Sequence, residues 1–302
     1  MKAMILAAGL GTRLLPYTLK RPKPLFPILN IPILHLTISR LRKAGFTEIV
    51  VNAHHLRDQI KKALQREAGV ILQEEESVLG TGGGLRRALP HFGPEPVLVV
   101  NGDIYHSIDY REVYRAHCTV RPDVSLVLQD FPRFNNVIIA EPDRVSGFNK
   151  SGYNIGRNEK ILAFTGIHVI NPEILHDISG DAASCIIDRY RDILQAGGTI
   201  RAHVATGHFW TDMGTPADYL QLHAGLLQRE IPVYDELLPA VAKGPFVGPQ
   251  QGSVAGDVKF LDWVCIGSHA RIGAGATLQR AVVWDKAVVP AGADIKDTIV
   301  TP

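Results

Sequence analysis

A glycine-rich loop near the N-terminus is the first group of residues that could do chemistry. Residues 6–14 read LAAGLGTRL and continue an apolar run, residues 3–8, that is typical of a buried strand. Glycines at the end of a strand let backbone N–H groups approach an anionic ligand closely, and such a nest binds phosphate. Gly9 and Gly11 are therefore candidate phosphate-binding residues.

The loop does not fit the two commonest nucleotide-binding motifs. A dinucleotide fingerprint would need a third glycine at the position of Leu14 and an acidic residue after the next strand, which closes at Val51-Asn52. A Walker P-loop would need a Gly-Lys-Ser/Thr sequence, which does not follow the loop. The glycines therefore predict a phosphate nest of another kind.

Two cations accompany the glycine loop. Arg13 closes it, and Lys23 lies between two prolines in the sequence RPKPL at residues 21–25. The flanking prolines hold the lysine on a stiff segment that cannot become helix. A solvated loop lysine is the ordinary alternative. Two cations beside a glycine nest suit a triphosphate, because one can neutralise a leaving pyrophosphate and the other the α-phosphate.

Two carboxylates complete the candidate set. Asp103 follows the buried run VVNG, at the end of a predicted strand that faces the ligand crevice in an open α/β sheet. Asp212 lies far away in the sequence, in FWTDMGTP at residues 209–216. Each aspartate is equally well explained as a turn residue. Together they could share one Mg²⁺, which typically takes one or two protein carboxylates plus substrate phosphates.

The elements that must position these groups alternate along the first 130 residues. Short β-branched runs at residues 3–8, 48–52, 70–72 and 97–100 are separated by helical patterns at 32–44, 56–64 and 84–89. This alternation predicts an α/β fold with a Rossmann-like, mostly parallel sheet and helices on both faces. Further strands are expected at 124–128, 137–140, 161–170 and 199–205. Helices should begin at Asn171-Pro172 and Thr215-Pro216, the latter with Asp218 as part of its cap.

The C-terminal 50 residues carry a different pattern. Steps of six from Val254 meet a series of mostly bulky residues: Phe260, Ile266, Ile272, Leu278, Trp284 and Pro290. Small or β-branched residues recur four positions after Val254 and after each of these residues except Pro290. This is the hexapeptide signature of a left-handed parallel β-helix. It predicts a domain over residues 253–302, a linker at 244–252 and a larger α/β domain over residues 1–240.

Composition excludes several classes of protein. The chain has 302 residues, 46% of them hydrophobic, and Lys plus Arg exceed Asp plus Glu by only 32 to 30. We therefore expect no nucleic-acid partner, because a nucleic-acid surface normally carries a basic excess. No apolar run reaches 18 residues, so no membrane partner is expected. The chain has three cysteines, which lie far apart and form no C-x-x-C pair: Cys118, Cys185 and Cys265. This spacing suits a reducing cytoplasm, and we expect all three at buried core positions.

The chain resembles the sugar-1-phosphate nucleotidyltransferases, also called NDP-sugar pyrophosphorylases. Six motifs carry the resemblance, in family order: LAAGLGTRL at 6–14, RPKPLFPI at 21–28, LGTGGG at 79–84, VVNGDI at 99–104, FTGIHVINPEIL at 164–175 and WTDMGTP at 210–216. In detail, the chain is most similar to N-acetylmuramate-1-phosphate uridylyltransferases, whereas the hexapeptide tail is more similar to that of mannose-1-phosphate guanylyltransferases and of glucose-1-phosphate thymidylyl- or uridylyltransferases.

The resemblance implies the nucleotidyltransferase fold and one reaction, in which an NTP and a sugar 1-phosphate give an NDP-sugar and pyrophosphate. It assigns catalysis to Arg13 and Lys23, and Mg²⁺ binding to Asp103 and Asp212. It also implies a set of nucleotide-binding residues: Leu6, Ala8, Gly9, Gly11, Thr12, Gly82 and Gly83. The resemblance also implies that the products are precursors of cell-wall or surface polysaccharide.

One motif departs from the family pattern. The resemblance places the sugar phosphate against Gly166 and against a Phe-x-Glu-Lys motif, which here reads Gly147-Phe148-Asn149-Lys150. Lys150 fits the pattern, whereas Asn149 replaces the carboxylate that contacts sugar hydroxyls. Lys160 is a second candidate for the phosphate contact. The identity of the sugar is therefore open.

Three readings compete at the level of function. A UTP-using enzyme for an amino-sugar or hexose 1-phosphate is preferred, and a GTP-using mannose-1-phosphate guanylyltransferase is the close alternative. A non-catalytic NDP-sugar-binding regulatory subunit belongs to another class, but such a protein would be expected to lose its charged catalytic set. Acyl transfer by the hexapeptide tail is disfavoured, because about seven hexapeptides are short for an acyl-CoA groove. A homo-oligomer through that tail stays open.

Overall fold

The computed structural model describes residues 1–302 apart from 141, 149–158, 181 and 250. The chain forms two compact units, each assembled from several segments. Unit 1 comprises Met1–Leu10, Ile38–Ile104 and Ile108–Trp210, and unit 2 comprises Gly11–Thr37, Tyr105–Ser107 and Thr211–Pro302. The glycine-rich loop therefore begins in unit 1 and continues in unit 2.

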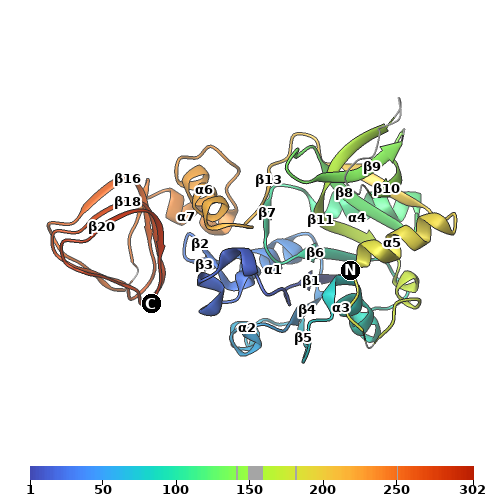
Figure 1. Cartoon of the computed structure of the whole chain (residues 1–302), viewed down its shortest axis with the longest axis horizontal. Coiled ribbons are helices and arrows are strands. Elements are labelled where there is room, and N and C mark those ends of the chain that lie inside the picture. Colours follow the sequence, from blue (N-terminus) through green and yellow to red (C-terminus); the bar gives the residue numbers. More distant parts are fainter. Residues whose placement is uncertain (141, 149–158, 181, 250) are drawn as a thin grey trace. The chain divides into compact units, whose positions relative to one another are not determined.

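Unit 1 is built around a mixed sheet with the strand order β5-β4-β1-β6-β11-β8-β12-β10-β9 (Figure 1). Its strands are β1 Lys2–Leu6, β4 Glu48–Ala53, β5 Val70–Glu74, β6 Val97–Asn101, β8 Val124–Gln129, β9 Asn135–Ala140, β10 Arg144–Phe148, β11 Glu159–Ile170 and β12 Ile200–Val204. The four strands from β5 to β6 run parallel, as the alternating pattern predicted.

The other half of the sheet departs from the predicted mostly parallel arrangement. β11 runs antiparallel to β6, β8 and β9, and β10 runs antiparallel to β12 and β9, whereas β12 is parallel to β8. Only residues 141–143 separate β9 from its neighbour β10, far fewer than the roughly dozen or more that a crossover between parallel strands needs. The sheet is therefore mixed rather than mostly parallel.

Helices cover both faces of this sheet, as predicted. They are α2 Arg57–Leu64, α3 Gly80–Ala88, α4 Tyr110–Val120 and α5 Ile186–Gln195, together with the end of α1 Ile33–Lys43. One face packs Met4 and Leu126 against Leu85 of α3 and Tyr190 of α5. α4 covers the opposite face, where its His117 bonds Ser125, the neighbour of Leu126 along β8.

Unit 2 contains the cation-bearing segment, two helices and the C-terminal strands. Its elements are β2 Pro27–Ile28, β3 Ile31–Pro32, β7 Ile104–His106, β13 Trp210–Asp212, α6 Pro216–Leu227 and α7 Leu238–Val241. β7 and β13, like α1, have residues in both units. The predicted cap of α6 is confirmed, because Thr215 Oγ1 accepts a hydrogen bond from Asp218 N at 3.2 Å.

The last part of unit 2 is a coil of short parallel strands, here called the C-terminal coil (residues 246–300). It contains β14 Phe246–Val247, β15 Ser253–Val254, β16 Lys259–Ile266, β17 Arg271–Ile272, β18 Thr277–Val283, β19 Val288–Val289 and β20 Asp294–Val300. The strands pair in parallel in the orders β14-β16-β18-β20 and β15-β17-β19. β14 lies inside the segment predicted as a linker, so part of that segment belongs to the coil.

The six-residue step predicted for this coil holds only through Leu278. Its core continues with Ala281, Val283, Ala287 and Val289, each one position earlier than a strict step would give. The reason is a shorter corner: Leu261 and Val264 pair with Gln279 and Ala281, so one residue fewer lies between the second pair. The slip turns Trp284 out of the coil core and leaves Val288 half exposed.

Three smaller expectations were wrong. α3 begins at Gly80 rather than near residue 84, and Asn171-Pro172 starts only a 3₁₀ turn, Pro172–Leu175. Cys185 is exposed, so it is no core residue.

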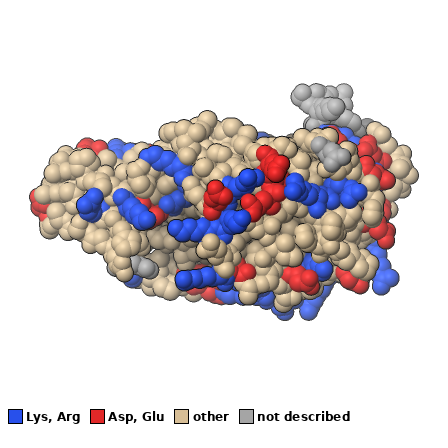
Figure 2. Space-filling view, turned by 90° about the horizontal axis from the view of Figure 1, so that it is seen from below, with Lys and Arg blue, Asp and Glu red and all other residues tan. Residues whose placement is uncertain are grey.

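In the part of the chain that the structure describes, no helix is long and apolar enough to cross a membrane. On the face seen in Figure 2, Lys and Arg side chains are interspersed with Asp and Glu.

Candidate functional site

The first half of the glycine loop is held by the parallel part of the sheet in unit 1. β1 lies between β4 and β6, so Leu6 is paired with Asn52 on one side and Asn101 on the other. Gly102 N donates to Leu6 O at 2.9 Å, and a Cβ at Gly102 would lie 3.0 Å from that oxygen. The loop at Ala7 and Ala8 thus leaves the sheet beside the turn that carries Asp103.

A buried polar network anchors the same loop from below. Asn52 Oδ1 accepts a hydrogen bond from Ala7 N at 2.7 Å, and Asn52 Nδ2 donates to Glu75 Oε1 at 2.8 Å. Gln73 Nε2 donates to Glu75 Oε1 at 3.2 Å and to Gly84 O at 3.0 Å. The network therefore links the glycine loop to α3, the helix that carries the LGTGGG motif.

Sequence reasoning missed Asn52, Gln73 and Glu75. In the sequence, Asn52 served only to show that no acidic residue ends this strand. A polar side chain at the end of a buried strand beside β1 was nevertheless a usable signal. Glu75 was part of the acidic run Glu74-Glu75-Glu76, yet it is fully buried while Glu76 is exposed. A fully buried carboxylate is uncommon unless it is hydrogen-bonded, as it is here.

Gly82 and Gly83 lie on α3 and are buried against the segment before α5. A Cβ at Gly82 would lie 2.7 Å from Ser184 Oγ, and a Cβ at Gly83 would lie 3.0 Å from Ala182 O. Ser184 is joined to this helix start, because Gly82 N donates to Ser184 O at 2.9 Å. Close packing therefore requires small residues at both positions, independently of any contact with a base.

Gly166 lies in β11 where the pairing with β8 shifts between Phe164 and His168. It has φ 79°, and a Cβ there would lie 2.4 Å from Asn101 Nδ2, so only glycine fits. Trp210 Nε1 fixes the adjacent backbone by donating to Thr165 O at 2.8 Å. The structure thus brings Gly166 beside Asn101, two residues before Asp103.

The second half of the glycine loop lies in unit 2 with the two cations. Gly11 adopts φ 63°, and a Cβ built on it would lie 2.8 Å from Thr18 Cγ2 and 3.6 Å from Lys23 Cβ. Thr12 and Arg13 follow in the 3₁₀ turn Thr12–Leu14. Lys23 begins another 3₁₀ turn, Lys23–Leu25, and is only 6% exposed. The structure therefore places Lys23 against the loop, and it is not a solvated surface lysine.

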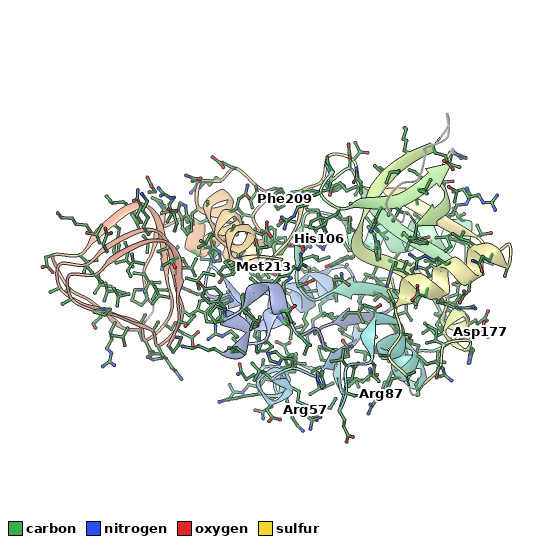
Figure 3. All side chains as sticks on the ribbon, in the orientation of Figure 1. Arg57, Arg87, His106, Asp177, Phe209 and Met213 are labelled. Carbon is green, nitrogen blue, oxygen red and sulfur yellow. The ribbon has the colours of Figure 1, made fainter. Side chains whose placement is uncertain are left out.

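Arg13 and Asp212 are brought together although 199 positions separate them. Arg13 Nη2 lies 3.3 Å from Asp212 Oδ2, and Gly214 packs against both side chains. Met213, labelled in Figure 3, follows Asp212 and is fully buried, which fixes the end of β13. The arginine is half exposed, so the pair holds the two groups in place without sealing them from a ligand.

The remaining predicted positions are less informative. Asn149 and Lys150 lie outside the described residues. Lys160 is exposed on β11. His168 is fully buried, burial lowers its pKa to about 3, and its Nδ1 lies 3.1 Å from Tyr190 Oη. A neutral histidine enclosed among apolar strands is a core residue.

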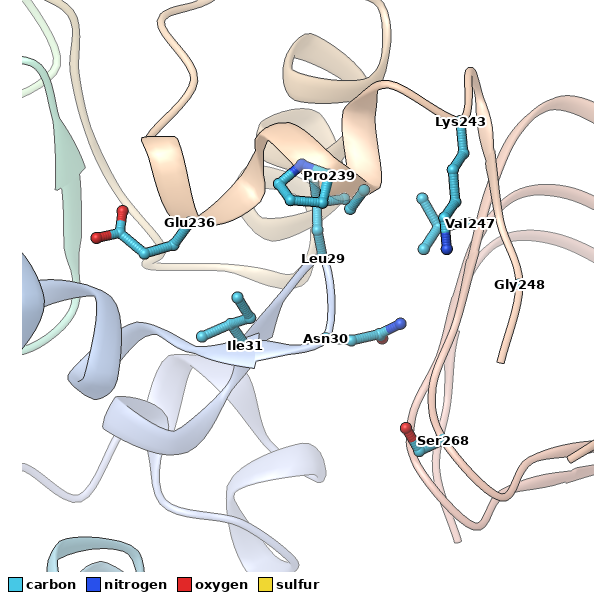
Figure 4. Close-up of a pocket in the computed structure, with 10 residues that line it drawn as sticks. Leu29, Asn30, Ile31, Glu236, Pro239, Lys243, Val247, Gly248 and Ser268 are labelled. Atoms are coloured by element: carbon cyan, nitrogen blue, oxygen red, sulfur yellow. The ribbon is translucent and has the colours of Figure 1, made fainter. Parts of the chain in front are cut away.

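Two further features of the described residues bear on ligands. They contain no group of three or more His, Cys, Asp or Glu side chains that could hold a metal ion. Unit 2 also has a cavity of about 150 Å³ (Figure 4). Its lining includes Asn30, Glu236, Lys243 and Ser268, and none of the residues predicted from the sequence.

Comparison with known proteins agrees with the motif analysis. Residues 2–136 match the family described as Nucleotidyl transferase. N-acetylmuramate alpha-1-phosphate uridylyltransferase of Neisseria meningitidis serogroup B is 33% identical over 71% of this chain and 94% of its own length. Mannose-1-phosphate guanylyltransferase of Mycobacterium tuberculosis is 28% identical over 97% of this chain and 82% of its own.

A solved structure with a similar fold is HddC from Yersinia pseudotuberculosis, complexed with GMP-PN. It is 25% identical, with a TM-score of 0.61 over 74% of this chain and 97% of HddC. Relatives named for UTP and for guanylyl transfer thus match at similar levels, so these likenesses do not select one base. The chain belongs to the sugar-1-phosphate nucleotidyltransferase family and is an enzyme of that type.

Proposed function

We propose that this enzyme transfers a uridylyl group from UTP to an amino-sugar or hexose 1-phosphate and releases pyrophosphate. The observation that carries the proposal is the set of charged groups around the glycine loop, with Lys23 packed against Gly11 and Arg13 held by Asp212. A protein that only bound NDP-sugar would not need this set. The choice of UTP is supported by the local motifs and by the uridylyltransferase relative at 33% identity.

The chemistry is an in-line displacement at the α-phosphorus. An oxygen of the sugar 1-phosphate attacks, a new P–O bond forms, and the bond from the α-phosphorus to the bridging oxygen breaks as pyrophosphate leaves. Lys23 neutralises charge on the α-phosphate, and Arg13 exchanges Asp212 for the departing pyrophosphate. Catalysis of this kind depends on positioning and charge neutralisation rather than on a covalent enzyme intermediate.

Asp103 and Asp212 are proposed as the protein ligands of a magnesium ion. Their carboxylate oxygens, together with substrate phosphates, would be the kind of ligands that Mg²⁺ usually takes. Such an ion, when bound, polarises phosphoryl oxygens as a Lewis acid. The ion pair with Arg13 keeps Asp212 oriented in its absence.

The substrates would be bound by the backbone of two glycine segments. The nucleotide contacts are proposed for Leu6, Ala8, Gly9, Gly11, Thr12, Gly82 and Gly83. The sugar phosphate is proposed to meet Gly166, Asn149 and Lys150. The tight fit of Gly82 and Gly83 against residues 182–184 fixes the position of α3, whose backbone is proposed to lie against the base.

We further infer that residues 1–240 act as the catalytic domain and that residues 253–302 form a short left-handed parallel β-helix. Parallel pairing of strands one coil apart, such as Lys259 with Thr277 and Thr277 with Asp294, supports the second inference. β20 ends one of its sheets, which offers an edge for pairing in a homo-oligomer. A cytoplasmic enzyme supplying cell-wall or surface polysaccharide precursors is the corresponding cellular role.

Transfer from GTP to mannose 1-phosphate is the second candidate, favoured by the guanylyltransferase relative that spans 97% of this chain. The test is a matrix of NTPs and sugar 1-phosphates with Mg²⁺, read out as pyrophosphate release. We expect the highest kcat/KM with UTP. Lys23→Met should abolish pyrophosphate release with UTP and the preferred sugar 1-phosphate. Release with GTP and mannose 1-phosphate alone would establish the alternative. No release in any cell would support a non-catalytic sensor.

A further inference from the structure

The segment that carries Lys23 is docked on the C-terminal coil within unit 2. Trp284 of the coil touches it at three points: its ring centroid lies 6.2 Å from that of Tyr17 and 4.8 Å from that of Phe26, and the guanidinium carbon of Arg21 lies 4.6 Å from it. Arg21 precedes Lys23 by two residues, and Phe26 follows it by three. Trp284 therefore contacts the chain on both sides of Lys23 in the sequence.

Asp285, the next residue of the coil, fixes the same arginine. Arg21 Nη2 lies 2.5 Å from Asp285 Oδ1, and only 17% of the arginine side chain is exposed. A cation held between a carboxylate and an aromatic face, largely out of water, is confined in both direction and distance. Arg21, Trp284 and Asp285 are here called the clamp.

The tryptophan is itself fixed from behind. Its Nε1 donates to Tyr219 Oη at 3.3 Å, and that hydroxyl donates to Pro27 O at 2.5 Å. Between the two contact points the chain has little freedom, because Pro22 and Pro24 flank Lys23 and the amides of Leu25 and Phe26 bond back to Pro22 O and Lys23 O. A displacement of Arg21 is therefore transmitted to Lys23 rather than absorbed.

We propose that the clamp positions Lys23 for nucleotidyl transfer, so that Arg21, Trp284 and Asp285 are positioning residues contributed across the coil–loop contact. This inference rests on the role proposed above for Lys23. Arg21 is a second cation two residues from Lys23, but its partners on the coil occupy it. Its charge serves the position of its neighbour.

The clamp predicts effects on turnover rather than on binding of the sugar. Arg21→Met and Asp285→Asn in the full chain should each lower kcat about tenfold, less than the roughly 10²-fold that a 1 Å misplacement of a reacting group can cost. The KM for sugar 1-phosphate should stay within about twofold, because the lost contacts are remote from the sugar. Arg21→Lys keeps the charge and should retain about a third of wild-type kcat.

The double variant and a matched control separate positioning from other roles. Arg21→Met with Asp285→Asn should be little worse than Arg21→Met alone, because Asp285 then has no contact with Arg21 left to lose. Asp297→Asn is the control, since it breaks the exposed pair with Arg280 on the coil, whose atoms lie 2.5 Å apart. Its kcat should equal that of the wild type.

Hydrogen exchange of peptides covering residues 19–26 supplies a readout that does not need activity. Exchange should accelerate in Arg21→Met and Asp285→Asn and stay unchanged in Asp297→Asn. Unchanged exchange, or an unchanged kcat in an active enzyme, would overturn the clamp. Loss of activity in Arg21→Met but not in Asp285→Asn or Trp284→Leu would overturn it too, by showing that Arg21 meets substrate directly. A wild-type enzyme that is inactive throughout the substrate matrix would instead refute the proposed function. The exchange result would still show whether the clamp restrains residues 19–26.

Discussion

Asn52 is the residue whose removal should test the architecture under the glycine loop. The change Asn52→Leu preserves approximate size but removes two buried hydrogen bonds, from Ala7 N at 2.7 Å and to Glu75 Oε1 at 2.8 Å. Asn52 is 1% exposed and Ala7 is 3% exposed, so water cannot replace the lost partner. Leaving a buried N–H without an acceptor costs about 1–3 kcal/mol.

The magnitude follows from which group loses its last partner. Glu75 Oε1 keeps the hydrogen bond from Gln73 at 3.2 Å, whereas the Ala7 amide keeps none that the structure shows. We therefore expect a loss of about 2–4 kcal/mol in the free energy of unfolding, the lost amide partner accounting for most of it. The KM for NTP should also rise, by about tenfold if the reoriented loop loses one hydrogen bond to phosphate.

The assay is urea denaturation followed by circular dichroism, together with steady-state kinetics of pyrophosphate release. Thr37→Val is the matched control, because Thr37 is buried and its hydroxyl donates to the carbonyl oxygen of Ile33 within its own helix at 3.0 Å. It should cost about 1 kcal/mol or less. An Asn52→Leu enzyme as stable as this control, with an unchanged KM for NTP, would refute the reasoning.

Three further predictions concern the charged set and the buried histidines. Arg13→Ala should lower turnover about 10²–10³-fold, measured as pyrophosphate release, without moving the urea midpoint, since its half-exposed pair with Asp212 contributes little stability. Asp103→Asn should abolish Mg²⁺-dependent turnover while the circular dichroism spectrum stays that of the wild type. Burial lowers the pKa of His168 to about 3 and that of His223 to about 4, so the unfolded chain takes up protons first as the pH falls below about 6.5. The free energy of unfolding should therefore fall between pH 6.5 and 4, by about 1.4 kcal/mol per pH unit for each histidine. The urea midpoint of His168→Gln should depend less on pH than that of the wild type, and an equal dependence on pH would contradict this.

The sequence predicted the parts of the site that local pattern controls. Strand periodicity identified β1, β4, β5 and β6, and glycine spacing identified the loop that leaves β1. The proximity of Arg13 to Lys23 in the sequence already suggested that both serve one ligand. These inferences depend on residues close together in the chain, for which spacing translates directly into geometry.

What the sequence could not predict depends on neighbours brought together by the sheet. Glu75 stood in a run of three acidic residues, and only the pairing of β4 with β5 shows that it meets Asn52 beneath the glycine loop. Gly82 and Gly83 carry low intrinsic helix propensity, so α3 was expected to begin after them. Their fit against residues 182–184 overrides that propensity, because any larger side chain would separate the two segments.

Trp284 shows how one residue can satisfy a repeat in the sequence and leave it in the structure. The six-residue step would place it in the coil core, yet the corner at Arg280 is one residue shorter than the corner at Asp262-Trp263, and a shift of one residue moves a strand's side chains to the opposite face. Val283 therefore enters the core, and Trp284 packs outward on Phe26 and Tyr219. Since an inward Trp284 could not reach Arg21, the irregular corner is the condition for the contact between the coil and the loop that carries Lys23.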